Sequence, residues 1–232
     1  MILLCSPLLS ENVKNIFHYL DCEMLCVPPC KSLAVPVQFH PDMLFAALGD
    51  RCILTDRGYA EDNAEFFSHL EGLVDIKFSE SSLAPEYPRD ILFDAAINGD
   101  MLFGRLEYTA PELLEKYTVK IDVKQGYARC STVMLSDAAI SADRGLCDKI
   151  SDCGLDVLRI SEGNITLSGY GYGFIGGASA VLEQIKTVVF FGDVSAHPDG
   201  EKITAFCEEH GYRVLYPKNE PLCDHGSVQV VF

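Results

Sequence analysis

The sequence predicts an α/β fold, a five-bladed propeller in which copies of one unit surround a common axis. A β-hairpin preceded by a polar loop recurs about every 40 to 50 residues, a period typical of propellers and solenoids. The last copy, Ser227 to Phe232, has no return strand, whereas the chain begins with an apolar run, Met1 to Cys5. We expect these two runs to pair and close the ring, because closure removes exposed sheet edges.

Each hairpin has an entry strand, a turn pair and a return strand. The first runs from Met43 to Leu48, turns at Gly49-Asp50 and returns from Cys52 to Asp56. Apolar runs joined by such polar or glycine pairs are typical of hairpins. The later copies have entry strands Ile91 to Ile97, Ser131 to Leu135 and Phe174 to Leu182, with returns Met101 to Arg105, Ala138 to Ser141 and Thr187 to Gly192.

A helix and a short outer strand precede each hairpin. Ser10 and Asp143 can cap the first and fourth helices, and Asp62 with Glu65 forms a capping-box pair for the second. Pro111 and Pro198 open the third and fifth helices, as proline does in a first turn. The outer strands are Met24 to Val27, Val74 to Phe78, Val119 to Val123, Leu155 to Ile160 and Tyr212 to Tyr216. We expect the helices outside and the small residues of the entry strands near the axis.

The composition indicates one enzyme-sized domain that spans residues 1–232. The chain has 48% hydrophobic residues and a net charge of −16, from 34 acidic and 18 basic side chains. This balance argues against nucleic acid as a partner, because phosphates bind Lys and Arg. It favours a small cationic ligand, although acidic surfaces also serve solubility alone. A homodimer is a further option that the sequence leaves open.

The ten cysteines are expected to be free thiols. No Cys or His pairs stand at zinc-site spacing, so we expect no metal. Gly171, Gly173 and Gly176 match a dinucleotide-binding pattern but run into an apolar strand instead of a helix, so we expect no cofactor. The sequence lacks the features of a signal peptide and has no membrane-spanning apolar run. We therefore expect a cytoplasmic protein without membrane contact.

Side chains that can carry chemistry stand in the loops that enter the inner strands. An imidazole titrates near neutral pH and suits acid–base work. Carboxylates that converge in a partly desolvated site stabilise positive charge. Because such loops face the axis of a ring, we expect these side chains around one central cavity. The candidates are His40, Asp42, Tyr87, Arg89, Asp90, Tyr127, Cys130, Tyr172, Asp224 and His225.

Four stretches of the chain resemble the penteins, the superfamily of guanidino-group-modifying enzymes. They are His40-Pro41-Asp42-Met43, Tyr87-Pro88-Arg89-Asp90, Val123 to Ser131 and Gly169 to Gly177. The superfamily includes arginine deiminase, agmatine deiminase, dimethylarginine dimethylaminohydrolase and the amidinotransferases, and the resemblance is strongest to a bacterial branch. It covers nearly the whole chain. It implies a ring of ββα-type units that binds a guanidinium between carboxylates.

The resemblance also implies roles for individual residues. In the characterised enzymes a Cys thiolate attacks the guanidinium carbon, and the His of a His-x-Asp motif moves protons. His40 and Asp42 match that motif. The Cys of those enzymes opens the last inner strand, where this chain has Gly226 and Ser227. Cys130 opens the third inner strand instead and is our candidate nucleophile, with an inert core thiol as the alternative.

Two classes of function therefore stay open. The first is a hydrolase or amidinotransferase-type enzyme acting on a small guanidino or amine cation, with Cys130 as nucleophile and His40 as general acid and base. The other candidates would then bind the substrate, although aspartates can also serve turns and tyrosines can simply pack. The second is a non-catalytic binding protein with the pentein fold, which the missing last-strand Cys favours. Translation initiation factor six resembles this fold and binds the ribosome.

Overall fold

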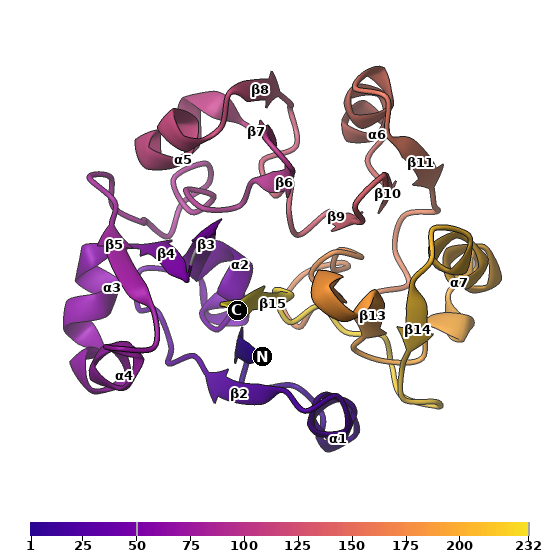
Figure 1. The fold of residues 1–232 in the computed structure, drawn as a ribbon, viewed down its shortest axis with the longest axis horizontal. Coiled ribbons are helices and arrows are strands. Elements are labelled where there is room, and N and C mark those ends of the chain that lie inside the picture. Colours follow the sequence, from indigo (N-terminus) through magenta and orange to yellow (C-terminus); the bar gives the residue numbers. More distant parts are fainter. Residues whose placement is uncertain (50, 232) are drawn as a thin grey trace.

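The computed structural model describes residues 1–49 and 51–231, and within these ranges the strands form five three-stranded sheets. The sheets lie around a common centre, and the longer helices lie at the periphery (Figure 1). In each sheet the middle strand is antiparallel to the inner strand and parallel to the outer strand. The repeating unit predicted from the sequence is therefore present in this part of the chain.

The strands take three positions in the sheets. The inner strands are β3 (Phe45–Gly49), β6 (Ala96–Asn98), β9 (Thr132–Met134), β12 (Ser179–Leu182) and β15 (Val228–Val230). The middle strands are β4 (Cys52–Thr55), β7 (Met101–Gly104), β10 (Ala138–Ser141), β13 (Thr187–Phe190) and β1 (Ile2–Cys5). The outer strands are β5 (Asp75–Phe78), β8 (Val119–Asp122), β11 (Asp156–Arg159), β14 (Arg213–Leu215) and β2 (Glu23–Cys26).

The two ends of the chain share one sheet, as the sequence predicted. β1 pairs antiparallel with β15, with Leu3 opposite Val230 and Cys5 opposite Val228. Figure 1 shows the N and C labels side by side near the centre of the molecule. Phe232, the predicted end of this strand, and Asp50, in the predicted first turn, lie outside the described residues.

Helices connect the middle strands to the outer strands. They are α1 (Glu11–Tyr19), α3 (Arg57–Asp62), α4 (Ala64–Leu70), α5 (Pro111–Lys116), α6 (Arg144–Asp152) and α7 (Gly200–Glu209). A short helix, α2 (Pro41–Leu44), and the 3₁₀ turns η1 (Val35–Val37), η2 (Leu106–Tyr108), η3 (Glu183–Ile185) and η4 (Val194–Ala196) lie in loops. No helix of the described ranges is both long and apolar enough to cross a membrane.

The caps explain where the helices begin. Ser10 accepts from the Val13 N–H and Asp143 from the Leu146 N–H, which confirms both predicted caps. The predicted start at Asp62 is wrong, because that residue ends α3. Asp56 caps this helix instead, since it directly follows β4 and accepts from the Tyr59 N–H at 2.7 Å.

Three inner strands begin later than the sequence predicted. Residues 41–44 form α2, and residues 91–95 and 174–178 are not strand. At the last of these the backbone is too crowded for a regular pleat. A Cβ built on Gly176 would lie 2.4 Å from the Arg129 carbonyl oxygen, and the Gly177 N–H donates to the Cys130 carbonyl at 2.8 Å. Glycine permits this close approach of two chain segments at the start of the inner strands.

The core lies between the sheets and the outer helices. In α1, Val13 and Phe17 are buried and face the sheet, and Phe17 packs edge-on against Phe191. Burying each such side chain contributes about 1.5 to 3 kcal/mol. This packing fixes the sheets and thereby the loops that enter the inner strands.

Candidate functional site

A cavity of about 260 Å³ lies where the loops enter the inner strands. His40, Cys130 and Asp224 reach it from three loops that precede β3, β9 and β15. The other lining residues are Val37, Met43, Tyr127, Leu167, Tyr170, Gly171, Tyr172 and Phe174. The cavity therefore combines a polar floor with a mostly apolar and aromatic wall.

A thiol, an imidazole and two carboxylates form the floor. His40 Nδ1 lies 3.8 Å from Asp224 Oδ1 and 4.0 Å from Asp42 Oδ1. The Cys130 thiol donates to Asp224 Oδ2 at 3.4 Å. One ligand atom each of His40, Asp42 and Cys130 lies within 4.8 Å of the others. These groups come from distant parts of the chain, and the fold places them within reach of one small molecule.

Backbone N–H groups hold the Asp224 carboxylate in place. The Phe174 N–H donates to its Oδ2 at 2.8 Å and the Gly226 N–H to its Oδ1 at 3.0 Å. Burial nevertheless raises the pKa of Asp224 to about 6. The carboxylate can therefore change its charge near neutral pH.

Asp42 is the least satisfied carboxylate of the floor. Neither of its oxygens accepts a hydrogen bond in the described part of the chain, and its side chain is fully buried. Burial raises its pKa, a positive charge on His40 opposes this shift, and the Asp224 charge adds to it. Because a buried anion without partners is costly, a cation that enters the cavity would stabilise this group.

Burial favours the uncharged forms of Cys130 and His40 in the free site. Burial, followed by the charges of Asp224, Asp42 and Asp94, raises the pKa of the Cys130 thiol well above its ordinary value. Burial lowers the pKa of His40. A neutral imidazole can accept a proton, but the thiol needs a nearby positive charge to ionise.

Asp94 holds the backbone at Cys130 through hydrogen bonds, and the sequence did not identify it as a site residue. Its Oδ1 accepts from the N–H groups of Arg129, at 2.8 Å, and Cys130, at 3.0 Å. Its Oδ2 is buried and without a partner among the described residues. The signal in the sequence was a carboxylate inside the apolar run 91–97, which we predicted as strand.

The structure brings half of the predicted site residues to the cavity wall. His40, Cys130, Asp224, Tyr127 and Tyr172 line it, and Asp42 lies at the floor in contact with His40. The others do not line it. The Tyr127 O–H donates to Asp90 at 2.7 Å, which places Asp90 behind the wall.

Three further candidates lie away from the cavity. Tyr87 is half exposed, stacks on Tyr127 at 5.7 Å and accepts a hydrogen bond from Arg105. Arg89 is exposed to solvent. His225 packs against Phe191, and burial lowers its pKa to about 4. None of these three contributes to the wall in the described structure.

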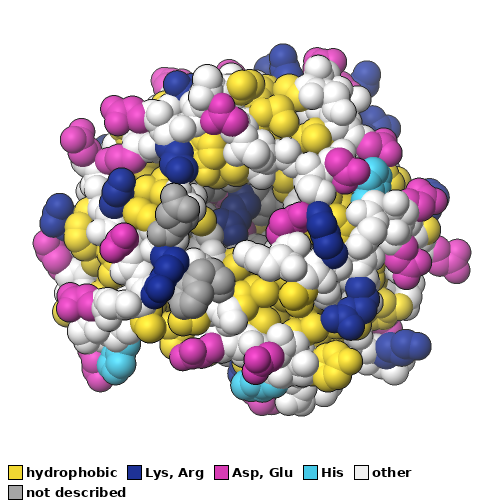
Figure 2. Space-filling view, in the orientation of Figure 1, with side chains coloured by type: hydrophobic (Ala, Val, Ile, Leu, Met, Phe, Trp, Pro, Cys, Tyr) yellow, Lys and Arg dark blue, Asp and Glu magenta, His cyan; other side chains and the backbone are white. Residues whose placement is uncertain are grey.

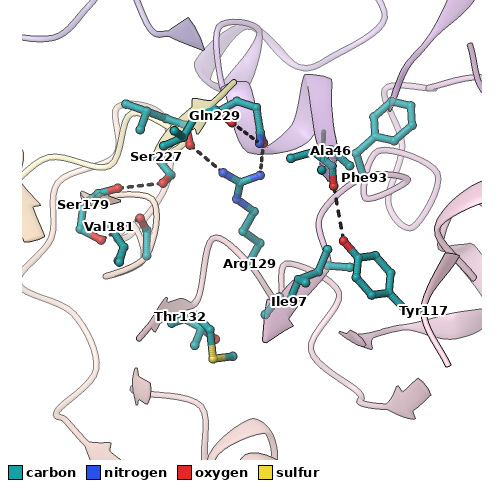
Figure 3. Close-up of a pocket in the computed structure, with 18 residues that line it drawn as sticks. Ala46, Phe93, Ile97, Tyr117, Arg129, Thr132, Ser179, Val181, Ser227 and Gln229 are labelled. Atoms are coloured by element: carbon teal, nitrogen blue, oxygen red, sulfur yellow. Dashed lines mark hydrogen bonds between the residues drawn. The ribbon is translucent and has the colours of Figure 1, made fainter. Parts of the chain in front are cut away.

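A second cavity, of about 330 Å³, lies farther along the inner strands (Figure 3). Arg129 projects into it and donates to Gln229 Oε1 and the Val228 carbonyl. Figure 2 shows a hollow near the centre of the molecular face that it draws, with Lys or Arg side-chain atoms at the bottom of the hollow. Arg129 thus lines this second cavity, whereas Cys130 lines the first. Burial, followed by the charge of Asp42, raises the pKa of Asp94 well above its ordinary value, and the Arg129 charge partly opposes the raised pKa of both Asp94 and Asp42.

His40, Asp42 and Cys130 could also hold a metal ion, because each offers one ligand atom to a common point. Imidazole nitrogen, carboxylate oxygen and thiolate sulfur are all ligands of Zn²⁺. The expectation that the protein works without a metal stays a prediction.

The comparisons with known proteins identify the fold. The model of a family described as a family of unknown function (DUF6873) matches residues 4–229, and no curated protein matches the chain. Among solved structures, a mutant DDAH from Pseudomonas aeruginosa complexed with citrulline has a TM-score of 0.54 at 16% identity and covers 90% of this chain and 79% of its own.

A second solved structure belongs to SxtG, an amidinotransferase from Microseira wollei in the saxitoxin biosynthetic pathway. It has a TM-score of 0.55 at 12% identity and covers 96% of this chain and 81% of its own. A dimethylarginine dimethylaminohydrolase adduct with S-methyl-L-thiocitrulline has a TM-score of 0.52 at 17% identity and covers 90% of this chain and 79% of its own. The chain thus has the fold of the pentein superfamily, as its sequence predicted.

Proposed function

The chain belongs to the DUF6873 family, and we propose that it is an enzyme that modifies a small guanidino cation, as a hydrolase or an amidinotransferase. The observation that carries the proposal is the convergence of Cys130, His40, Asp42 and Asp224 on one cavity. The proposal also takes residues 1–232 as one domain and the sheets as blades of a closed ring. The pairing of β1 with β15 supports closure.

The charges of the floor favour a cation. Asp42 and Asp224 are buried carboxylates, and no Lys or Arg lines the cavity in the described ranges. A unit positive charge about 4 Å from one ionised carboxylate gains about 4 kcal/mol at an effective dielectric constant of 20. A guanidinium adds planar, forked donors that match paired carboxylates.

The cation would also activate the thiol. Its positive charge lowers the pKa of Cys130, so that His40 can accept the thiol proton and the thiolate can attack the guanidinium carbon. One amino group then takes that proton and leaves as ammonia or an amine, which gives a thiouronium on Cys130. Attack by water, with loss of its proton to His40, releases a urea and the thiol. Attack by a second amine would instead transfer the amidino group.

Turnover of guanidino compounds tests the proposal. The purified protein is incubated with a panel of guanidines, and ammonia and ureido products are measured. Cys130→Ser should abolish product formation and retain ligand binding. Cys147→Ser is the matched control, because Cys147 is a buried thiol of α6 outside the cavity. Equal activity of Cys130→Ser and the wild type would refute the role of Cys130.

A non-catalytic binding protein is the second candidate, and one observation favours it. The last inner strand follows Gly226 and Ser227 instead of a cysteine. Ser227 does not take the place of that cysteine, because it lines the second cavity and its O–H donates to the Ser179 carbonyl at 2.8 Å. Ligand binding by the wild type without any product, over the whole guanidine panel, would favour this candidate.

A further inference from the structure

The wall of the cavity differs in character from its floor. Above the carboxylates and the thiol stand Val37, Met43 and Leu167, together with the rings of Tyr127 and Phe174. Within the described ranges, no Lys or Arg is among the lining residues. Among the described residues, the wall thus has no cationic side chain that could pair with a carboxylate of a ligand. Away from the floor it also has no anionic side chain that could pair with an ammonium of a ligand.

The arginines of neighbouring loops do not provide a cation for a ligand carboxylate in the cavity. The Arg105 guanidinium donates to the Tyr87 O–H and stacks near the rings of Tyr87 and Tyr108. Arg89 is exposed. Neither lines the cavity. A ligand carboxylate held in the cavity would therefore meet aromatic and aliphatic side chains.

The mouth of the cavity carries exposed aromatic surface. Tyr170 and Tyr172 are 50% and 45% exposed, on a loop that also contains Gly169, Gly171 and Gly173. Exposed aromatic groups beside a cavity are typical of a surface that a ligand covers. An apolar chain that leaves the floor would pass between these rings and the wall.

We propose that the cavity takes a guanidinium with an uncharged apolar tail and discriminates against guanidino amino acids. This inference rests on the proposed function, since it assumes a guanidinium on the floor. Each methylene that the wall removes from water should raise affinity about fourfold. An α-carboxylate or α-ammonium would lose its hydration without gaining a partner, which lowers affinity.

Three ligands of similar length separate these contributions. n-Pentylguanidine has a methyl group where agmatine has its ammonium, and arginine carries both an ammonium and a carboxylate at the end of its tail. Their affinities are measured by isothermal titration calorimetry with the Cys130→Ser protein, so that turnover does not interfere. We expect n-pentylguanidine to bind at least tenfold more tightly than arginine, with agmatine between them.

Two variants identify the cause of any preference. Tyr172→Ala should weaken n-pentylguanidine but leave the affinity for unsubstituted guanidinium within twofold, because only the tail reaches Tyr172. Arg105→Gln should leave all three affinities unchanged. Arginine binding as tightly as n-pentylguanidine, or losing affinity in Arg105→Gln or Arg89→Gln, would overturn the inference and leave the proposed function intact. Failure of every guanidinium ligand to bind would overturn both.

Discussion

Replacing Asp224 by Asn should make the Cys130 thiol more acidic in the free protein. The Cys130 sulfur lies 3.4 and 3.7 Å from the two carboxylate oxygens, and after burial their charge is the largest cause of the raised thiol pKa. At an effective dielectric constant of 20, one unit charge at this distance contributes about 4 to 5 kcal/mol. This Coulomb energy is an upper limit, because water and the new amide dipole compensate.

The assay is iodoacetamide labelling of Cys130, followed by peptide mass spectrometry at several pH values. For each unit by which the thiol pKa falls, the thiolate fraction rises about tenfold, but the less basic thiolate is also a weaker nucleophile. The labelling rate at pH 8 should therefore rise about threefold for each unit. We therefore expect labelling about 3 to 40 times faster in Asp224→Asn than in the wild type. The variant should be destabilised by about 1 to 3 kcal/mol, because the amide cannot accept from both Phe174 and Gly226 as the carboxylate does.

Asp90→Asn is the control for this experiment. It removes the same charge from a carboxylate that accepts from Tyr127 and does not contribute to the shift in the Cys130 pKa. Its Cys130 labelling should stay within about twofold of the wild type. The electrostatic account of the thiol is wrong if Asp224→Asn remains folded and its Cys130 reacts no faster than in the wild type.

The carboxylates of the floor make ligand binding and stability depend on pH. Guanidinium affinity should fall as pH drops through about 6, where Asp224 gains its proton, and tighter binding at pH 5 than at pH 7.5 in calorimetry would contradict this. Because the folded-state pKa of Asp224 is raised, its stabilising contribution is complete below its ordinary pKa and is lost as pH rises through about 6. Urea unfolding at pH 4 and 7 should show a loss of about 2 kcal/mol that Asp224→Asn lacks. Asp94→Ala should lower the free energy of unfolding by about 2 to 4 kcal/mol, because two buried backbone N–H groups lose their acceptor; a change below about 0.5 kcal/mol in urea unfolding would rule out this support. Gly177→Ala should disrupt the site and cost at least about 1 to 3 kcal/mol, since the added Cβ would lie 2.0 Å from Asp224 Oδ1. Gly171→Ala, with no atom within 4 Å of the added Cβ, is its control in thermal unfolding and should match the wild type.

The sequence alone determined the repeating unit and the pairing of the chain ends. Hairpins, helix caps and outer strands depend on interactions within a few residues, so their signals are local. Ser10 and Asp143 therefore identified two helix starts correctly. The predicted helix start at Asp62 was wrong because Asp56, six residues earlier, has the same capping chemistry and directly follows β4.

The composition of the floor followed from the sequence only in part. His40, Asp42, Cys130 and Asp224 were recognisable as residue types at the entries to inner strands, and the ring predicted that such entries converge. The sequence did not show that Asp90 lies behind Tyr127 or that Tyr87 packs beside it. Both positions depend on how one loop folds over another. Asp94 escaped notice for a similar reason, since its run was predicted as strand.

Only the tertiary structure decided which groups touch. Cys130 and Asp224 are 94 residues apart, and their contact requires the third and fifth units to meet at the axis. Gly176 and Gly177 allow this meeting because a side chain there would collide with Arg129 and Asp224. The sequence thus determined the unit and its repetition, which rest on local hydrogen bonds and periodic burial. Packing around the axis determined the distances and the shifted pKa values of the site, because burial and charge proximity arise only when distant segments come together.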